Sequence, residues 1–150
     1  MSRVALISDT HGLLRPEVVA AIRGVEAILH MGDVGDMELF HALCKIAPVH
    51  AVRGNTDFGK LARKLPLTTA VNVCGRSAYL VHRLEDLDID PQTAGVDLVL
   101  YGHTHKPADE TRDGVQYVNP GSIGARRFTL PISFALMDAD GTITFRTIEP

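Results

Sequence analysis

The chain has 150 residues and a net charge of −3, with 45% hydrophobic and 22% charged residues. This length and balance predict a single domain, residues 1–150, that buries its own core. Its apolar runs are too short to cross a membrane, and its negative charge offers no basic field to a long nucleic acid. Because no export signal precedes the first apolar run, we expect a cytoplasmic protein in which Cys44 and Cys74 are reduced packing residues.

The first half of the chain alternates short apolar runs with helical patterns. Buried strands are predicted at Val4–Ile7, Ala27–Leu29 and Val49–Val52. One predicted helix begins at Pro16 and stops at Gly24, and another covers Met37–Lys45 with Asp36 as its N-cap. This order of strands and helices favours a parallel sheet with right-handed crossovers.

The second half of the chain is rich in apolar runs separated by turns, which predicts antiparallel strands. These runs are Leu67–Val73, Ala78–Val81, Leu98–Tyr101, Val115–Val118, Pro131–Met137 and Thr142–Ile148. The turn signals at Cys74-Gly75-Arg76 and Asp140-Gly141 predict hairpins. Gly59–Pro66 is interpreted as a loop. Together the two halves predict a layered α/β domain of two packed sheets with helices outside.

Polar side chains follow five of the predicted strands at the point where each strand ends. They are Asp9, His11, Asp33, Asn55, His82, His103 and His105. Ligands bind at the carboxyl ends of strands in open α/β sheets, so these side chains should converge. Carboxylates and imidazoles gathered in one cleft are poorly satisfied unless a cation joins them. Seven nitrogen and oxygen ligands without a thiolate suit two ions of manganese, iron, nickel, cobalt or zinc.

The ordered set of motifs resembles that of the calcineurin-like metallophosphoesterases, in particular their small bacterial and archaeal branch. The motifs are Asp9-x-His11, Gly32-Asp33, Gly54-Asn55-x-Asp57, His82, Gly102-His103-Thr104-His105 and Asn119-Pro120-Gly121-Ser122. The resemblance implies an α/β four-layer fold, a β-sandwich of two mixed sheets flanked by helices. No insertion is long enough to form a cap domain, so the site should be open.

The resemblance also implies two metal sites that share one carboxylate. The first ion would be held by Asp9, His11, Asp33 and His105. The second ion would be held by Asp33, Asn55, His82 and His103. Asp33 would bridge the ions, for which manganese is the first expectation and nickel, cobalt, iron and zinc are alternatives.

The implied activity is hydrolysis of small phosphate esters, most simply phosphodiesters. As a hypothesis, a hydroxide that bridges the two ions attacks phosphorus. Asp33, Asn55 and His103 are the expected catalytic residues, and Asn55 and Arg53 the candidate substrate-binding residues. Arg53 is equally well interpreted as a surface arginine paired with a carboxylate. The expected partners are a small phosphate ester and further copies of the chain in a homodimer or homotetramer, without long nucleic acid or membrane.

Two positions depart from the family pattern. Many relatives carry a histidine where this chain has Thr56, and that histidine is thought to protonate the leaving group. Threonine cannot do so near neutral pH, which favours diesters and good leaving groups. Arg83 stands where relatives usually have glycine, and it either crowds the second metal or offers a cation to the phosphate. The change at Thr56 keeps open a non-catalytic or weakly catalytic metal-binding scaffold for protein partners, as in the retromer subunit of this fold.

Other polar residues near the motifs are assigned supporting roles. Asp57 and Thr104 are expected to orient metal ligands. The Asn119–Ser122 segment is expected to form a tight turn beneath the site. The remaining histidines, namely His30, His41 and His50, are interpreted as structural. For His30, at the strand end before Gly32-Asp33, support of the neighbouring site residues is the alternative to packing.

Overall fold

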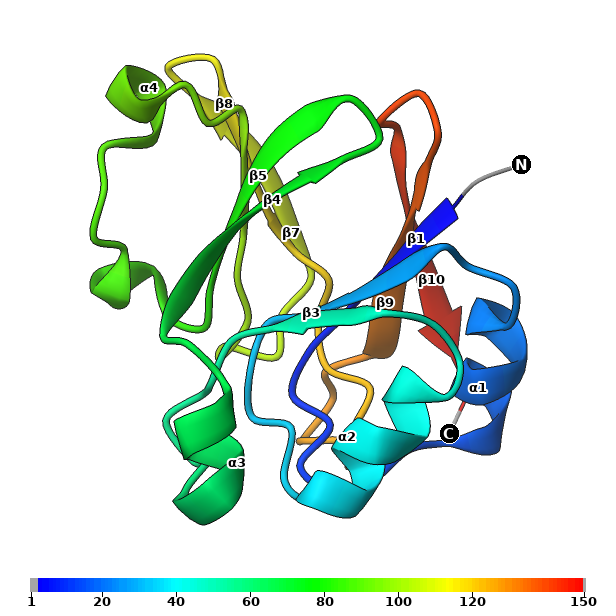
Figure 1. The fold of residues 1–150 in the computed structure, drawn as a ribbon. Helices are drawn as coiled ribbons and strands as arrows, with labels where there is room; N and C mark the ends of the chain where they lie inside the picture. The colour runs from blue at the N-terminus through cyan, green and yellow to red at the C-terminus, as the bar shows by residue number, and fades with distance from the viewer. Residues whose placement is uncertain (1–2, 150) are drawn as a thin grey trace.

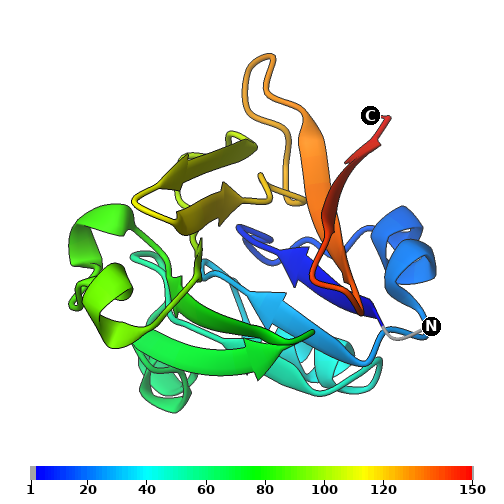
Figure 2. The ribbon, with the colours of Figure 1, turned by 90° about the horizontal axis from the view of Figure 1, so that it is seen from above.

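A computed structural model describes residues 3–149 and contains two five-stranded sheets (Figures 1 and 2). Sheet A consists, in spatial order, of β10 (Ile143–Ile148), β9 (Ile132–Asp138), β1 (Arg3–Ile7), β2 (Ala27–His30) and β3 (Val49–Ala51). Sheet B consists of β4 (Thr68–Val73), β5 (Arg76–Val81), β6 (Leu98–Leu100), β8 (Val115–Asn119) and β7 (Ala108–Arg112). Both sheets mix parallel and antiparallel pairs, as predicted.

Helices connect the strands and cover the outer faces of the sheets. They are α1 (Pro16–Ile22), α2 (Met37–Cys44), α3 (Gly59–Lys64) and α4 (Pro91–Ala94), with a 3-10 turn at Leu84–Asp86. Figure 2 shows α1 on one side of the molecule and the segment that contains α4 on the other. Strands β1, β2 and β3 pair in parallel, which confirms the topology predicted from the strand and helix order. Within residues 3–149 we find no helix long and apolar enough to cross a membrane.

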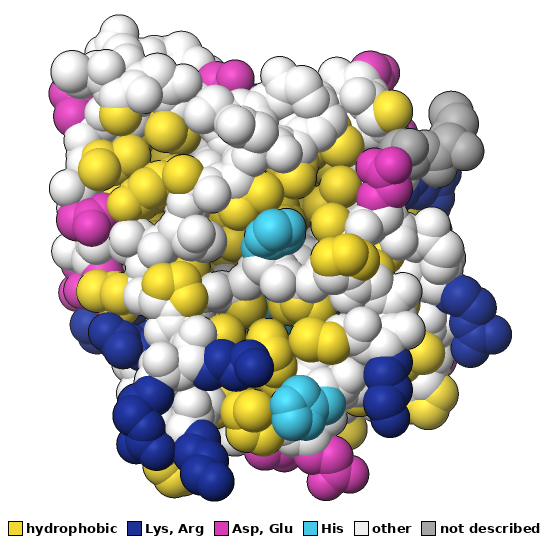
Figure 3. Space-filling model, in the orientation of Figure 1, with side chains coloured by type: hydrophobic (Ala, Val, Ile, Leu, Met, Phe, Trp, Pro, Cys, Tyr) yellow, Lys and Arg dark blue, Asp and Glu magenta, His cyan; other side chains and the backbone are white. Residues whose placement is uncertain are grey.

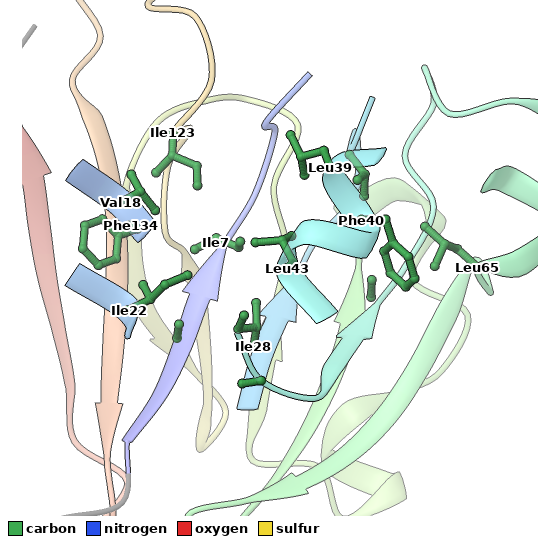
Figure 4. Packing of buried hydrophobic residues seen from close by; sticks show 14 of the residues in the cluster. Ile7, Val18, Ile22, Ile28, Leu39, Phe40, Leu43, Leu65, Ile123 and Phe134 are labelled. Atoms are coloured by element: carbon green, nitrogen blue, oxygen red, sulfur yellow. The ribbon is translucent and has the colours of Figure 1, made fainter. Parts of the chain in front are cut away.

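Three apolar clusters separate four layers of structure. The first packs α1 and α2 onto sheet A through residues such as Ile22, Leu43 and Phe134 (Figure 4). The second fills the space between the sheets. The third packs the segment around the 3-10 turn onto the outer face of sheet B. The layers therefore run from helices through sheet A and sheet B to helices again, the four-layer arrangement that the motifs imply.

Strand β1 shows how the sequence pattern produces these layers. Successive side chains of a strand point to opposite faces, and every residue of β1 from Val4 onward is buried. Ala5 and Ile7 belong to the cluster under the helices, whereas Val4 and Leu6 belong to the cluster between the sheets. A strand buried on both faces must be apolar throughout, so the first polar residues mark the point where it leaves the core.

The structure differs from the sequence predictions at three places. The Gly59–Pro66 segment was predicted as a loop, which is wrong, because six of its residues form α3 with Leu61 as its only buried residue. Strand β7 was not predicted, since four of its five side chains are exposed and it lacks an apolar pattern. Cys44 is exposed at the end of α2, so the packing role predicted for it is also wrong.

The N-cap prediction is confirmed, because the Asp36 carboxylate accepts a hydrogen bond from the Leu39 N–H at 2.7 Å.

The core between the sheets should dominate stability. Leu98 is fully buried there, whereas Leu67 is 42% exposed. We expect Leu98→Ala to lower the free energy of unfolding by about 2–5 kcal/mol through lost apolar burial and a cavity. Leu67→Ala should change it by less than about 1 kcal/mol. Urea denaturation followed by circular dichroism measures both, and equal losses would contradict this assignment of the core.

Candidate metal centre

All seven side chains predicted as metal ligands lie where strands of the two sheets end. Sheet A contributes four of them from the loops after β1, β2 and β3, namely Asp9, His11, Asp33 and Asn55. Sheet B contributes three from the ends of β5 and β6, namely His82, His103 and His105. Potential ligand atoms fall into two groups, Asp9–His11–His105 and Asp9–Asp33–His82, each within 4.8 Å of one another. The site thus lies across the seam between the sheets.

Asp9 lies at the centre of this arrangement and is fully buried. Its Oδ1 atom is 3.4 Å from Nε2 of His105, 3.7 Å from Nε2 of His11 and 3.9 Å from Nε2 of His82. Its Oδ2 atom accepts hydrogen bonds from the Ser8 hydroxyl and from the backbone N–H of His103. Burial acts to raise the pKa of Asp9, but His105, His11 and the Ser8 hydroxyl together hold that pKa well below its ordinary value. Asp9 is therefore a carboxylate, with one oxygen anchored and the other directed into the site.

Asp33 belongs to the second group and also lies near His11 of the first. Its Oδ1 atom accepts the backbone N–H of Thr56 at 2.9 Å. Its Oδ2 atom lies 3.2 Å from Nε2 of His82 and 3.5 Å from Nε2 of His11. Burial opposes ionisation, yet contacts with His82 and the Thr56 N–H lower the pKa of Asp33. A single ionised oxygen of Asp33 thus lies within 3.5 Å of one imidazole from each group.

The tautomer of His82 directs one ring nitrogen at the two carboxylates. Its Nδ1 atom lies 2.7 Å from the Met31 carbonyl, which can only accept, so Nδ1 carries the proton. In the neutral ring the lone pair on Nε2 then faces the carboxylates of Asp33 and Asp9. These carboxylates raise the pKa of His82 against the opposing effect of burial. Histidines that bind metals characteristically donate their other ring N–H to a carbonyl or carboxylate in this way.

The buried atoms that lack a hydrogen-bond partner test whether the site fits metal ions. In the described part of the chain they include Asp9 Oδ1, His11 Nε2 and His82 Nε2, as well as Arg15 Nε and His105 Nδ1, which is not the ring nitrogen nearest Asp9. Leaving such groups unpaired is costly, and the first three are metal-ligand atoms that face one another. Two ligand atoms about 2.1 Å from one ion at a tetrahedral angle lie about 3.4 Å apart, which matches the separations around Asp9. The donor set therefore fits divalent metal ions.

Asn55 and His103 form the open side of the site. The Asn55 side chain is exposed, and its Oδ1 atom lies 3.1 Å from Nδ1 of His103. The ring centroids of His103 and His82 are 5.2 Å apart. Arg53, two residues before Asn55, donates a hydrogen bond to the Ala62 carbonyl of α3 at 3.4 Å rather than to a carboxylate. A ligand could reach the centre from this side.

Two glycines allow the loops to approach one another this closely. A Cβ atom at Gly54 would overlap Oδ1 and the backbone nitrogen of Asp33. A Cβ atom at Gly102 would overlap the Ser8 hydroxyl and approach Oδ2 of Asp9. Each glycine immediately precedes a candidate ligand. The Gly-Asn and Gly-His motifs therefore supply a ligand and, through the glycine, leave room for a residue of the adjacent loop.

Five of the candidate ligands have left-handed backbone conformations. The φ angles are 56° at Asp9, 47° at His11, 57° at Asp33, 74° at His103 and 64° at His105. Non-glycine residues in this region are strained by roughly 1–3 kcal/mol each, and such strain clusters at functional sites. The tight turns at the strand ends direct successive side chains back toward the centre, and the backbone strain is the cost of that geometry.

The Asp57 side chain supports the site through four hydrogen bonds from backbone N–H groups. Its Oδ2 atom accepts backbone N–H groups of Asp33, Val34 and Gly54, and its Oδ1 atom accepts that of Gly35. One carboxylate thus ties the loop after β2 to the loop after β3. The role predicted for Asp57, orienting ligands, agrees with these contacts.

His30 links neighbouring loops of the site, which agrees with the supporting role that was the alternative to packing. It is fully buried, and its Nδ1 atom accepts the Gly32 N–H at 3.1 Å. Its Nε2 atom therefore carries the proton and donates to the Thr10 hydroxyl, which donates to the Val34 carbonyl. Burial lowers the pKa of His30 to about 4, which keeps the ring neutral. Only its place at a strand end beside Gly32-Asp33 could have suggested this link between loops. His41 and His50 are exposed on α2 and β3.

The Asn119–Ser122 turn supports the site from below, as predicted. The Asn119 amide donates to the Gly102 carbonyl and to the Thr104 hydroxyl, and its oxygen accepts the Gly121 N–H. The Ser122 hydroxyl donates to the Asp9 carbonyl at 3.0 Å. These bonds join the loops that carry Asp9 and His103.

Arg83 does not point at the metal ligands. Its guanidinium pairs with the Asp86 carboxylate through Nε at 2.9 Å and a second nitrogen at 3.4 Å. The side chain is thereby held on the 3-10 turn, and its charge is balanced there. Arg83 also lines a pocket together with His103, so it lies near a proposed ligand of the second ion while its guanidinium is paired with Asp86.

Comparison with known proteins identifies the family to which this site belongs. The model of the calcineurin-like phosphoesterase superfamily domain matches residues 2–142. The chain belongs to this superfamily. A probable metallophosphoesterase of Methanothermobacter thermautotrophicus is 31% identical, with 92% of this chain and 86% of that protein covered. Phosphodiesterase YfcE of Escherichia coli K12 is 29% identical, with 93% and 89% covered.

A solved structure confirms the fold of this calcineurin-like phosphoesterase. Vps29 of Chaetomium thermophilum superimposes with a TM-score of 0.79 over 99% of this chain and 97% of that chain. The sequences are only 20% identical, so the likeness concerns the fold. It agrees with the β-sandwich flanked by helices that the motifs imply.

The contacts of Asp57 lead to a prediction about stability. In Asp57→Asn an amide NH2 replaces one carboxylate oxygen and opposes backbone N–H groups, so charge-assisted hydrogen bonds are lost. We expect the free energy of unfolding to fall by about 2 kcal/mol or more, together with the bound metal content. Asp113→Asn, in an exposed hairpin turn, is the matched control and should change neither. Urea denaturation and elemental analysis measure both, and wild-type values for Asp57→Asn would refute the role.

The left-handed backbone at His103 gives a second prediction. Glycine adopts positive φ without penalty, whereas alanine does not. His103→Gly should therefore be more stable to urea than His103→Ala by about 1 kcal/mol, although both lack the imidazole. If alanine is the more stable of the two, the backbone is not strained at this position.

Proposed function

We propose that this chain is a metal-dependent phosphodiesterase that hydrolyses small phosphate esters. The observation that carries the proposal is the set of buried, unpartnered nitrogen and oxygen atoms around two ionised carboxylates. A structural metal site would be closed, whereas this one is open at Asn55. The name of the related phosphodiesterase supports the same activity.

The proposed ligand sets follow the separations between side chains. Asp9, His11, Asp33 and His105 would hold one ion, and Asp33, Asn55, His82 and His103 the other. The position of Asp33 Oδ2 between His11 and His82 supports a shared carboxylate. When bound, two such ions lower the pKa of a water nucleophile and neutralise charge on the phosphoryl oxygens. Manganese is the proposed ion, and nickel, cobalt, iron and zinc are compatible with the same donors.

The chain's own residues bind and orient the ester. The NH2 group of the exposed Asn55 side chain can donate a hydrogen bond to a phosphoryl oxygen while its Oδ1 atom binds the metal. The Thr56 side chain supplies no general acid, so the leaving group must depart without a proton from this position. Asp33 and His103 are the further proposed catalytic residues, and Arg53 is a proposed substrate contact. These features favour diesters with good leaving groups.

The charge distribution favours a small substrate over a long polyanion. The net charge is −3. On the face seen in Figure 3, basic side chains gather over α3 at one corner, with hydrophobic and neutral side chains over β3 and β4. A long nucleic acid would need a continuous basic track. A cytoplasmic location and a homodimer or homotetramer remain predictions.

A second candidate function is a metal-binding scaffold for protein partners. The observations that favour it are Thr56 in place of the usual acid and two exposed aromatic side chains, Phe58 at 80% and Phe128 at 93%. Exposed aromatic side chains are common anchors in protein interfaces. A scaffold would bind metal through the same residues but hydrolyse no ester, so the two candidates differ in one assay.

The decisive assay uses bis-p-nitrophenyl phosphate. The protein is stripped with a chelator and manganese is added back. We expect manganese-dependent turnover in the wild type and a loss of more than about 100-fold in His103→Ala, beyond the effect typical of residues that only orient ligands. His41→Ala, which removes an exposed histidine of α2, is the matched control and should retain full activity. Absence of turnover with manganese, nickel, cobalt, iron or zinc in the folded protein would instead favour the scaffold.

A further inference from the structure

A small pocket lies directly beside the metal centre, and the mechanism proposed above does not use it. Its volume is about 140 Å³. It is lined by Arg83, Leu84, Glu85, Tyr101, Gly102, His103 and Thr104. His103 belongs both to this pocket and to the proposed ligand set. The pocket is therefore close enough to the proposed metal centre to hold a part of the same substrate molecule.

The pocket has an apolar and rigid floor. Tyr101 is 7% exposed and belongs to the cluster on the outer face of sheet B. Leu84 packs against the same cluster from the 3-10 turn. These side chains cannot turn away without opening that layer, so the pocket is preformed. An apolar, preformed pocket favours an apolar ligand group over a hydrated polar one.

Arg83 gives the pocket a planar wall. Its guanidinium is held by Asp86 through two contacts, at 2.9 and 3.4 Å, and Glu85 lies 3.9 Å away. Two carboxylates therefore balance its charge, so a second phosphate of a substrate would gain little here. A guanidinium with a fixed plane stacks well on the face of an aromatic ring. The wall thus selects for a neutral aromatic group rather than an anion.

We propose that this pocket binds an aromatic ester group of the substrate while the phosphoryl group lies at the metal centre. The inference rests on the proposed function and narrows it to aryl or nucleoside esters over short alkyl esters. The volume is suitable for one ring, since an apolar cavity of about 150 Å³ in another protein holds benzene. Leu84 and Arg83 are then specificity-determining residues, one through apolar contact and the other through stacking.

Binding of two phosphonates to the manganese-loaded protein tests the pocket without hydrolysis. Phenylphosphonate and methylphosphonate share the phosphoryl group and differ only in the organic group. By isothermal titration calorimetry we expect phenylphosphonate to bind about tenfold more tightly, which corresponds to about 1.4 kcal/mol. Leu84→Ser and Arg83→Gln should each reduce this ratio and leave the affinity for methylphosphonate unchanged. Leu67→Ser, an exposed leucine outside the pocket, should preserve the ratio.

The outcomes separate this inference from the proposed function. Equal affinities in the wild type, no binding of either phosphonate, or a ratio unchanged in both folded variants would overturn the aromatic pocket. Hydrolysis of bis-p-nitrophenyl phosphate together with equal affinities would overturn the pocket alone. A preserved ratio without hydrolysis of any diester would overturn the proposed function alone. Two variants are used so that a folding defect in one leaves the other informative.

Discussion

Two carboxylates are buried among imidazoles at the point where the two sheets meet. Much of the surrounding polar structure holds these two carboxylates in position. Burial by itself opposes the charge on Asp9 and Asp33. Hydrogen bonds from Ser8 and from the Thr56 backbone anchor one oxygen of each carboxylate. The other oxygens face ring nitrogens at 3.2–3.9 Å, separations that two ligands of one cation also have. The remaining polar network serves to hold these two oxygens in place.

The backbone carries much of that task. Turns that follow the buried strands adopt positive φ at five candidate ligands, and the neighbouring glycines leave space for side chains of the adjacent loop. Asp57 and His30 then fasten one loop to the next through backbone N–H and carbonyl groups. Strained backbone conformations lower the free energy of unfolding, and the apolar clusters on both faces of sheet A offset that loss.

The parts of the structure that could be predicted from sequence are those with a strong local pattern. The apolar run of β1 and the polar residues directly after it indicated both a buried strand and a site at its end. Helix α3 and strand β7 were missed because one buried leucine and an exposed edge strand leave no periodic signal. The chain of hydrogen bonds through His30 and the pairing of Arg83 with Asp86 depend on the relative positions of separate segments, which no local pattern encodes.

The candidate ligands come from both halves of the sandwich, and this division has a consequence for folding. Asp9 and Asp33 belong to sheet A, whereas His82 and His105 belong to sheet B, and the space between the two sheets is filled by an apolar cluster. Each proposed ion would have ligands from both sheets and would therefore cross-link the sheets at one end of their interface. Because such an ion binds only the folded arrangement, free metal concentration would set the melting temperature as well as the activity. Metal starvation would then loosen the sandwich from the end that carries the site.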